Sequence, residues 1–354
     1  MTDVYIQLAR HLDNLPAGFP STESGVEIRI LKRLFTEAEA ELAARLMMMP
    51  EPASAIAARI GQSADELEPM LEGMSKKGLI FRSTKNGVRH YMAAQFVIGI
   101  WEYHLNDLDE ELIRDVNEYL PELMKKQWVQ QETKQLRVIP VGRSIAAGMS
   151  VMPYEAAEEI IAKQSKVVVS PCICRREHEM MGKGCGKPME VCLSFGAGAA
   201  FYEENGLGRA VSREEAMEIL KTGLSAGLVL QPGNAQKPAN ICMCCGCCCQ
   251  VLKNLKSLDR PALAVHTNYF AEVAPESCTA CGACAAVCQM DAIAVVDVAA
   301  VDCHRCIGCG LCVPACPSEA VSLREKPAEE RYIPPRNPFE TYLNMARERG
   351  KIPG

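Results

Sequence analysis

The sequence lacks any apolar run that approaches the roughly 18 residues of a membrane-spanning helix. Its longest candidate, residues 191–201, is short and nearly half glycine and alanine. The opening residues 1–10 also lack the basic stretch and the continuous apolar run of a secretory signal. We therefore expect a cytoplasmic protein without a transmembrane segment.

The chain also lacks a phosphate-binding glycine loop, a dinucleotide-binding fingerprint and a nucleophile paired with a general base. No catalytic residue is therefore assigned, and enzymatic activity stays open. The net charge of -6 argues against a surface built as a whole for nucleic acid. A length of 354 residues, with 48% hydrophobic and 23% charged residues, indicates a globular protein of two or three domains.

Cysteine is absent from the first 171 residues, yet the whole chain contains 19 cysteines. Ten lie between Cys172 and Cys249, and nine lie between Cys278 and Cys316. In a reducing compartment, cysteines at this density are metal ligands or redox groups rather than structural disulfides. The distribution predicts a metal-free N-terminal half followed by two cysteine-rich modules.

The second cysteine group repeats one spacing twice. Residues 278–288 and residues 306–316 each have three cysteines separated by two residues and a fourth after a gap of three. Three such cysteines can wrap one loop around three irons of a cubane cluster, and the fourth thiolate comes from elsewhere. We expect Gly282, Gly308 and Gly310 to let the backbone approach closely and direct N–H groups toward cluster sulfurs.

About 60 residues, roughly 265–325, resemble a bacterial two-cluster 4Fe-4S ferredoxin. The resemblance implies two 4Fe-4S clusters, with the fourth cysteine of each run completing the cluster of the other run. It also implies short strands at 292–296 and 320–323. Carried over position by position, the ligands of the first cluster are Cys278, Cys281, Cys284 and Cys316. The ligands of the second cluster are Cys306, Cys309, Cys312 and Cys288.

The sequence departs from the ferredoxin pattern at two positions. Gln289 stands where proline is usual, which costs some rigidity and leaves ligation intact. Cys303 lies three residues before Cys306 and is interpreted as a bystander thiol, with exchange into the ligand set as the alternative. Zinc also binds four thiolates, but two interlocked runs favour iron-sulfur clusters.

The first cysteine group fits no standard ferredoxin spacing. Directly adjacent cysteines in extended backbone point in opposite directions, so we expect neighbours within residues 244–249 to serve different partners. Ten thiols can hold one cubane, two cubanes or one larger irregular cluster. We predict an additional iron-sulfur site, with zinc or free redox-active thiols as alternatives. The candidate ligands are Cys172, Cys174, Cys185, Cys192, Cys242, Cys244, Cys245, Cys247, Cys248 and Cys249.

Short patterns predict the surroundings of this first group. The segments 167–170 and 228–230 have the apolar composition of buried strands. Between them, Ser212 and Glu215 form a capping signature for a helix through about Lys221. These elements predict a compact α/β module. Basic side chains near the first cysteines are available to offset cluster charge or to lower a thiol pKa, and they are Arg175, Arg176, Lys183 and Lys187.

In the N-terminal half, helical patterns cover residues 27–49, 53–60 and 63–77, and a hairpin follows with its turn at Asn86 and Gly87. This order resembles a winged helix-turn-helix domain over residues 25–95. Four acidic residues in the third helix argue against DNA as its partner. The basic residues of the hairpin leave DNA as an alternative, and they are Arg82, Lys85 and Arg89.

Further along, the pattern predicts an amphipathic helix over residues 108–127 and a strand over residues 136–141. The expected fold is therefore α+β and multidomain. Its segments are an N-terminal arm (1–24), a winged-helix-like domain (25–95), a helical connector (96–165), a cysteine-rich metal-cluster module (166–262), a ferredoxin domain (263–326) and a tail (327–354).

The predicted function is iron-sulfur electron transfer through two 4Fe-4S clusters, with an additional cluster in the module of residues 166–262 and with a redox protein as partner. Such clusters indicate an anaerobe. One alternative is a redox- or metal-sensing transcription regulator that uses the winged helix. The other is a reductase whose catalytic centre is the unusual cysteine site.

Overall fold

The computed structural model describes residues 3–145 and 151–351. The chain forms two compact units. The first consists of the chain up to Thr133 with residues 197–209 and the segment from Tyr342 onward, and the second of residues 134–196 and 210–341. Both cysteine groups therefore belong to one compact unit, together with the last part of the expected connector. Among the described residues, no helix combines the length and the apolarity that crossing a membrane requires.

The first unit opens with five helices, the last four of which fall on the three expected helical segments. Their bounds are α1 (Val4–Asn14), α2 (Val26–Leu34), α3 (Glu37–Ala43), α4 (Ala53–Ile60) and α5 (Ala64–Lys76). The expected helix over 27–49 is wrong as a continuous element. Helix α2 ends at Leu34, and Thr36 caps a new helix, α3, because its hydroxyl accepts the N–H of Glu39 while the Glu39 carboxylate accepts the N–H of Thr36.

The same unit contains a three-stranded sheet in the order β1-β3-β2. Its strands are β1 (Glu51–Pro52), β2 (Ile80–Lys85) and β3 (Val88–Ala93). The hairpin turn lies at Asn86 and Gly87, both with positive φ, as the sequence predicts. Strand β1, which the sequence pattern did not indicate, pairs with β3 through Glu51 and Tyr91.

Several of the remaining segments of the first unit contribute aromatic rings that pack together. Ring stacking between Phe81 and Phe201, with centroids 5.0 Å apart, holds residues 197–209 in this unit. The expected helix over 108–127 is instead α7 followed by a short π-helical segment, η2. The elements are η1 (Phe96–Ile100), α6 (Trp101–Tyr103), α7 (Glu110–Leu123) and η2 (Met124–Trp128), together with most of α10 (Gly196–Glu204) and the second part of α14 (Pro338–Glu348).

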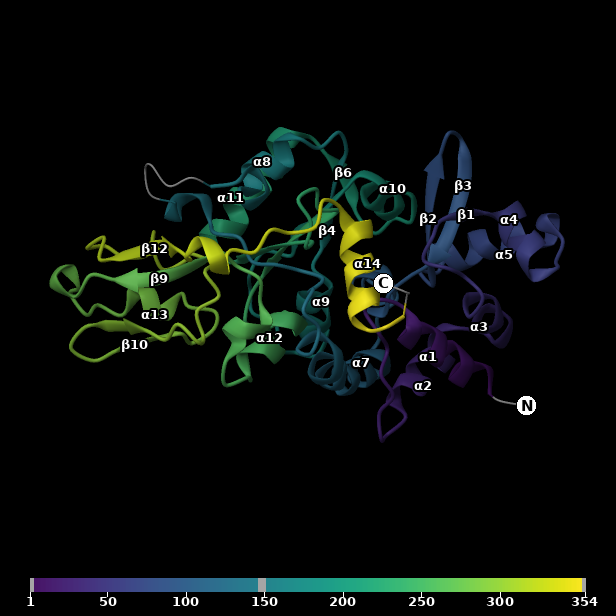
Figure 1. Ribbon diagram of the computed structural model, residues 1–354, viewed down its shortest axis with the longest axis horizontal. Coiled ribbons are helices and arrows are strands. Elements are labelled where there is room, and N and C mark those ends of the chain that lie inside the picture. Colours follow the sequence, from purple (N-terminus) through teal and green to yellow (C-terminus); the bar gives the residue numbers. More distant parts are fainter. Residues whose placement is uncertain (1–2, 146–150, 352–354) are drawn as a thin grey trace. The chain divides into compact units, whose positions relative to one another are not determined.

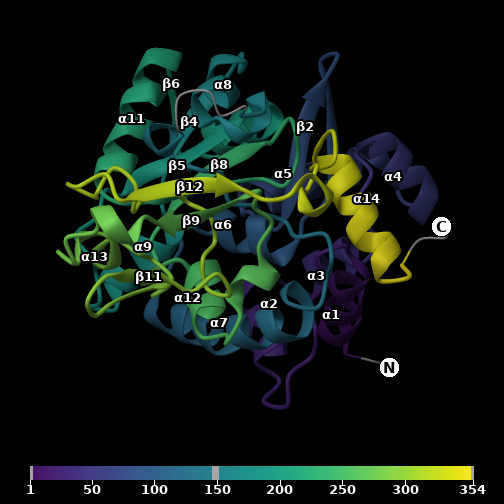
Figure 2. The ribbon, with the colours of Figure 1, turned by 60° about the vertical axis from the view of Figure 1, so that its left-hand side comes forward.

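The second unit contains a five-stranded sheet in the order β6-β4-β5-β8-β7. Its strands are β4 (Val167–Pro171), β5 (Glu190–Phe195), β6 (Arg209–Val211), β7 (Val229–Pro232) and β8 (Asn240–Cys244). Helix α11 (Arg213–Ser225) packs on β4 and β5, and α8 (Ala157–Ala162) packs on α11 (Figure 2). The expected capping residue Ser212 is confirmed by its hydrogen bond from Glu215.

The two faces of this sheet differ in what they carry. The side chain of Met243 on β8 lies against Gly223 of α11. Because side chains alternate along a strand, Cys242 and Cys244 point to the face away from α11. Two short helices begin beside cysteines of the same group, namely α9 (Ile173–Met180) after Cys172 and α12 (Gln250–Lys256) after Cys249.

The ferredoxin-like part of the second unit is built from two strand pairs. Strand β9 (Tyr269–Val273) pairs with β12 (Val321–Glu325), and Figure 1 shows the yellow β12 beside the green β9. Strand β10 (Ile293–Val295) pairs with β11 (Ala299–Val301). The strands expected at 292–296 and 320–323 are thus confirmed as β10 and β12. The short helices here are η5 (Pro261–Ala264), η6 (Pro275–Ser277), α13 (Ala283–Ala286) and η7 (Ala328–Glu330).

Residues 136–141, expected as a strand, join the two cysteine-rich parts. The expected strand is wrong as a continuous element, because these residues form only isolated bridges, from Leu136 to Gly233 and from Ile139 to Leu230 of β7, with Ile139 donating to Leu230 over 3.2 Å. On the ferredoxin side, Val138 donates to His266 over 2.9 Å and Val141 donates to Cys309 over 3.0 Å. Two short helices flank the segment that follows, η3 (Gly142–Ser144) and η4 (Pro153–Glu155). Residues 136–141 therefore connect the central sheet to the ferredoxin-like part through backbone hydrogen bonds.

Candidate metal centres

One cysteine quartet combines the two ferredoxin runs. Cys288, from the first run, lines a small cavity together with Cys306, Cys309 and Cys312 from the second run. Cys288 also acts electrostatically on each of the other three sulfurs. The fold thus brings together the four residues that the resemblance implies for the second cluster.

The other ferredoxin quartet also draws on both runs. Cys284 is buried in the core of this domain, and Cys278 and Cys316 pack against that core and act on it electrostatically. Cys281 is exposed at the same loop, and Cys303 is an exposed thiol of the connecting segment. The arrangement places Cys316, the last cysteine of the second run, beside the first run.

Backbone N–H groups point at several of these sulfurs. Ala271 donates to Cys306 over 3.4 Å, and Ala292 donates to Cys288 over 3.3 Å. Burial raises the pKa of Cys309 to about 12 and also raises the pKa of Cys306. A buried thiol with a raised pKa ionises when a metal replaces its proton, and the N–H donors then stabilise the thiolate.

Neighbouring protein atoms crowd two of the three glycines of the cysteine loops. A Cβ on Gly308 would lie 2.2 Å from the carbonyl oxygen of Tyr269, and one on Gly310 would lie 2.2 Å from the Ser144 hydroxyl. Gly282 has no heavy atom within 4 Å of such a Cβ, so only its φ of +77° favours glycine there. Crowding by neighbouring protein atoms therefore constrains Gly308 and Gly310 and not Gly282, and the expected approach of all three to a cluster stays a prediction.

In the central module, six cysteines form a closed ring on the sheet face away from α11. Cys242 and Cys244 share one face of β8, and the register of β5 with β8 sets Cys192 opposite Cys242. The three others lie at the starts of α9 and α12. In ring order the members are Cys172, Cys174, Cys249, Cys244, Cys242 and Cys192.

Each thiol of this six-cysteine ring hydrogen-bonds to the two thiols beside it. These bonds lower the pKa of Cys172, Cys242 and Cys249 well below the ordinary thiol range. The same bonds raise the pKa of the three intervening thiols. Each sulfur of the ring therefore interacts closely with the sulfurs on both sides of it.

Polar groups supply further donors to the ring. The side-chain amide of Asn240 donates to Cys242 over 3.4 Å, and that of Gln231 donates to Cys249 over 3.8 Å. The buried Arg175 guanidinium acts electrostatically on Cys172, and its Nε has no hydrogen-bond partner in the described part of the chain. A positive charge and amide donors suit a ring of thiolates that holds a negatively charged cluster.

The four remaining cysteines of the module form a separate tetrad. The sulfurs of Cys185, Cys245, Cys247 and Cys248 all lie within 4.8 Å of one another. Cys245 and Cys248 are buried, Cys185 is half-buried and Cys247 is exposed. Burial raises the pKa of Cys245 to about 11. The tetrad joins the turn between β8 and α12 to the loop that follows α9.

The ten cysteines are thus brought together in two groups of six and four. The expectation that adjacent cysteines serve different partners is confirmed for Cys244 and Cys245 and for Cys248 and Cys249. It is wrong for Cys247 and Cys248, which both belong to the tetrad because they lie in a turn rather than in extended backbone. Sequence reasoning missed the assignment of Cys192, Cys242 and Cys244 to strands. The alternation of cysteine with apolar residues at 242–244 is the signal that indicates one side of a strand.

Gln289 connects the ferredoxin domain with the tetrad. Its side-chain oxygen accepts the backbone N–H of Gly246 over 2.8 Å, and its Nε2 donates to the carbonyl oxygen of Gly227 over 3.1 Å. Gly246 lies between Cys245 and Cys247, whereas Gln289 directly follows Cys288. The amide side chain that replaces the usual proline therefore spans the junction between two cysteine sites.

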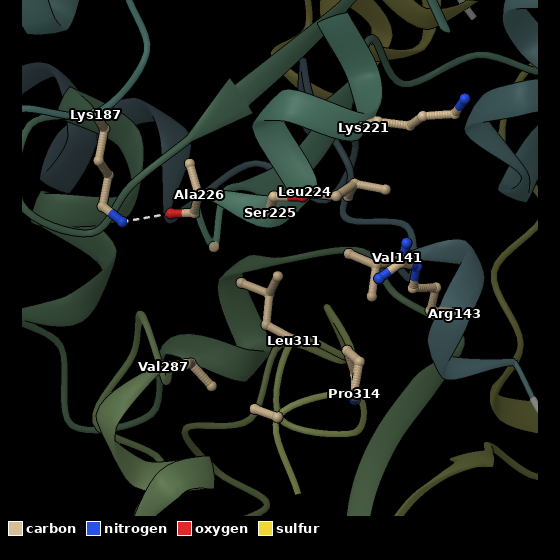
Figure 3. A pocket seen from close by; sticks show the side chains of 12 residues that line it. Val141, Arg143, Lys187, Lys221, Leu224, Ser225, Ala226, Val287, Leu311 and Pro314 are labelled. Carbon is tan, nitrogen blue, oxygen red and sulfur yellow. Dashed lines mark hydrogen bonds between the residues drawn. The ribbon is translucent and has the colours of Figure 1, made fainter. Parts of the chain in front are cut away.

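A pocket of about 340 Å³ lies between α11 and the ferredoxin loops (Figure 3). Val287 and Leu311 line it from the ferredoxin side, each directly beside a cysteine in sequence. Its cationic residues are Arg143, Lys187 and Lys221, and its lining contains no carboxylate. The Lys187 amine donates to the carbonyl oxygen of Ala226, as the dashed line in Figure 3 marks. The pocket therefore presents positive charge next to the cysteine loops.

Comparison with known proteins identifies the C-terminal cysteines as part of a known type of domain. A family model described as 4Fe-4S dicluster domain matches residues 277–320. No curated protein and no solved structure matches the chain. The C-terminal part of this protein is thus a ferredoxin-like iron-sulfur domain, and its cysteine geometry together with the family match indicates iron-sulfur electron transfer.

Proposed function

We propose that the protein relays single electrons through two 4Fe-4S clusters to a further iron-sulfur centre in the six-cysteine ring. In this proposal Cys278, Cys281, Cys284 and Cys316 hold the first cluster. Cys306, Cys309, Cys312 and Cys288 hold the second. Both quartets combine residues from the two runs, which supports the crossed assignment.

The observation that carries the proposal is the bridge made by Gln289. Gln289 directly follows Cys288, a proposed ligand of the second cluster, and one hydrogen bond joins its side chain to the turn of Cys245 and Cys247. The six-cysteine ring is directly continuous with this turn through Cys244 and Cys249. A short path of covalent and hydrogen bonds therefore leads from the ferredoxin domain to the ring.

A ring of six thiols exceeds the four that a cubane needs. Six converging thiolates therefore favour one larger cluster over a cubane with two spare ligands. Soft thiolate ligands suit iron-sulfur clusters. The amide donors of Gln231 and Asn240 and the charge of Arg175 are groups that tune the potential of such a centre.

The cationic pocket beside the ferredoxin loops supports a redox partner that has an acidic surface. Three cations without a carboxylate attract an acidic patch, and complementary charge speeds encounter. Val287 and Leu311 of this pocket flank cysteines of the proposed second cluster, so an electron exchanged there has a short path.

The N-terminal order of helices, strand and hairpin supports a winged-helix-like domain, for which we propose a protein-interaction role. Arg82 is buried and binds Glu204 over 3.0 Å, and Arg89 binds the same carboxylate over 3.0 Å. Two of the three cations that left DNA as an alternative are therefore engaged within the unit. This observation disfavours the transcription-regulator alternative.

The test is a count of iron and acid-labile sulfide on the anaerobically purified full chain. The two ferredoxin clusters account for about eight irons, so we expect about twelve or more with matching sulfide. Cys242→Ser, in the ring, should remove the iron and sulfide in excess of about eight. Cys303→Ser, an exposed thiol, is the matched control and should remove neither. An unchanged count in Cys242→Ser would refute a centre in the ring.

A further inference from the structure

We propose that Cys185, Cys245, Cys247 and Cys248 bind a single tetrahedral divalent metal ion, Zn²⁺ or Fe²⁺, through four thiolates. This site is separate from the six-cysteine ring and does not depend on the electron relay proposed above. The ligand chemistry is shared by the two ions, because both accept four soft thiolates in a tetrahedron.

The spacing of the sulfurs favours one ion over a cluster. A metal-sulfur bond of about 2.3 Å sets the sulfurs of a tetrahedral site about 3.8 Å apart. The four sulfurs of the tetrad already lie within 4.8 Å of one another, so only a small contraction is needed. A cubane attaches each thiolate to a different iron and so requires wider spacing.

The ferredoxin quartets provide an internal comparison. Among the residues that the structure describes, the tetrad is the group of potential ligand atoms that meets this close spacing, and neither ferredoxin quartet does. The sulfurs are therefore more widely spaced in the ferredoxin quartets, as a cluster requires, than in the tetrad, as a single ion requires.

Both arms of the tetrad are held in place by neighbouring groups. Gly246 leaves no room for a Cβ, which would lie 2.3 Å from the carbonyl oxygen of Gln289, so the turn of Cys245–Cys248 packs directly on the ferredoxin domain. The loop of Cys185 is anchored by Arg175, which donates to Pro188 over 3.0 Å and to Met243 of β8 over 2.7 Å. Such support preorganises a metal site.

Four thiolates fill the tetrahedral coordination shell and leave no open position. Closed sites of this kind are structural. We infer that the ion fastens the loop after α9 to the turn between β8 and α12. Thiolates in excess of the metal charge leave the site negative, and the Arg175 guanidinium acts electrostatically on Cys245 as well as on ring sulfurs. One buried cation thus serves both sites.

The test measures zinc, iron and acid-labile sulfide in the full chain, purified anaerobically, for Cys185→Ser, Cys247→Ser and the control Cys303→Ser. We expect each tetrad variant to lose about one metal ion per chain with its sulfide content unchanged. Loss of zinc identifies Zn²⁺, and loss of one iron without sulfide identifies Fe²⁺. The control should retain the ion.

X-ray absorption on the unmodified chain gives an independent readout if a variant fails to fold. For zinc, the expected first shell is four sulfurs at about 2.3 Å with no iron neighbour. Sulfide loss in the tetrad variants would overturn the proposal, because it would assign a cluster to these residues. An unchanged metal content in both variants would overturn it as well. Neither outcome affects the ring, whose own test is Cys242→Ser.

Discussion

At the scale of single residues, Cys288 distinguishes two ligand assignments in the ferredoxin domain, in which it binds either the cluster of its own run or the cluster of the other run. It lies in the first run but shares a cavity with Cys306, Cys309 and Cys312. We predict that Cys288→Ala damages the cluster of that second quartet and spares the other, because only the second quartet loses a thiolate. Electron paramagnetic resonance of the reduced protein, with iron counting, distinguishes the two clusters.

Cys303→Ala is the control for this experiment, since Cys303 is exposed and its loss should leave both signals. If Cys288→Ala instead abolishes the signal of its own run and leaves the second quartet intact, the crossed assignment is wrong.

Gln289 tests the connection between the two cysteine-rich parts. Gln289→Ala removes the hydrogen bonds to Gly246 and Gly227 but no thiolate. We predict electron transfer from the ferredoxin clusters to the central module that is several-fold slower, with unchanged iron content. Rapid-mixing spectroscopy after reduction of the ferredoxin clusters gives the rate.

The matched control is Gln236→Ala, which removes an amide hydrogen bond to Pro334 in the same unit. Its transfer rate should equal that of the unmodified protein. Equal rates in Gln289→Ala and the control would show that electrons take another path.

At the scale of elements, the two halves of the ferredoxin domain place different demands on the same loop. Gly308 and Ala280 occupy corresponding positions, both with positive φ, yet the first half tolerates alanine there. The second half cannot, because a Cβ on Gly308 would meet the carbonyl oxygen of Tyr269. Packing against β9 therefore breaks the equivalence of the repeats.

The next pair of corresponding residues gives a prediction. Gly282 and Gly310 have φ values of +77° and +76°, but only Gly310 is crowded, by Ser144 and Leu323. Gly282→Ala should cost about 1 kcal/mol of backbone strain. Gly310→Ala should cost more, about 2–4 kcal/mol, because overpacking is added. Denaturant unfolding of the cluster-loaded protein measures both, and equal losses would contradict the packing argument.

The helix boundaries in the N-terminal half show how far capping residues determine where a helix starts. The apolar spacing over residues 27–49 predicts one helix, but the side chains of Thr36 and Glu39 form a capping box that starts a new one. The opposite holds at Ser63, the residue before α5, whose side chain makes no capping hydrogen bond although α5 begins at Ala64. Capping signals are thus informative about positions where helices start, and less so about the bonds made there.

At the scale of the whole molecule, we predict that the full chain shows no sequence-specific binding to duplex DNA at moderate salt. Arg82 and Arg89 of the hairpin are bound to Glu204, and α5 presents Asp65 and Glu66 in its first turn. These acids repel the phosphate backbone. A mobility-shift assay with competitor duplex is the measurement, and a specific complex that survives competition would favour the regulator alternative.

The sequence alone determined the features that depend on nearby residues. The repeated cysteine spacing predicted the iron-sulfur domain that the family match at 277–320 supports, because one loop must supply three thiolates. The pair Asn86 and Gly87 predicted the hairpin turn, because these two residue types adopt positive φ readily, and both have positive φ in the structure. Opposite directions of adjacent side chains separated Cys244 from Cys245.

Only the tertiary structure decided how ten cysteines divide into a ring and a tetrad. Cys192 meets Cys242 because β5 pairs with β8 in one register, and Cys185 meets the turn at Cys247 across 62 residues of chain. Spacing in sequence carries no information about such pairings, since strand register and the anchoring of Arg175 are set by packing. The role of Gln289 has the same origin, because its partners Gly227 and Gly246 are distant in sequence and adjacent only in the fold.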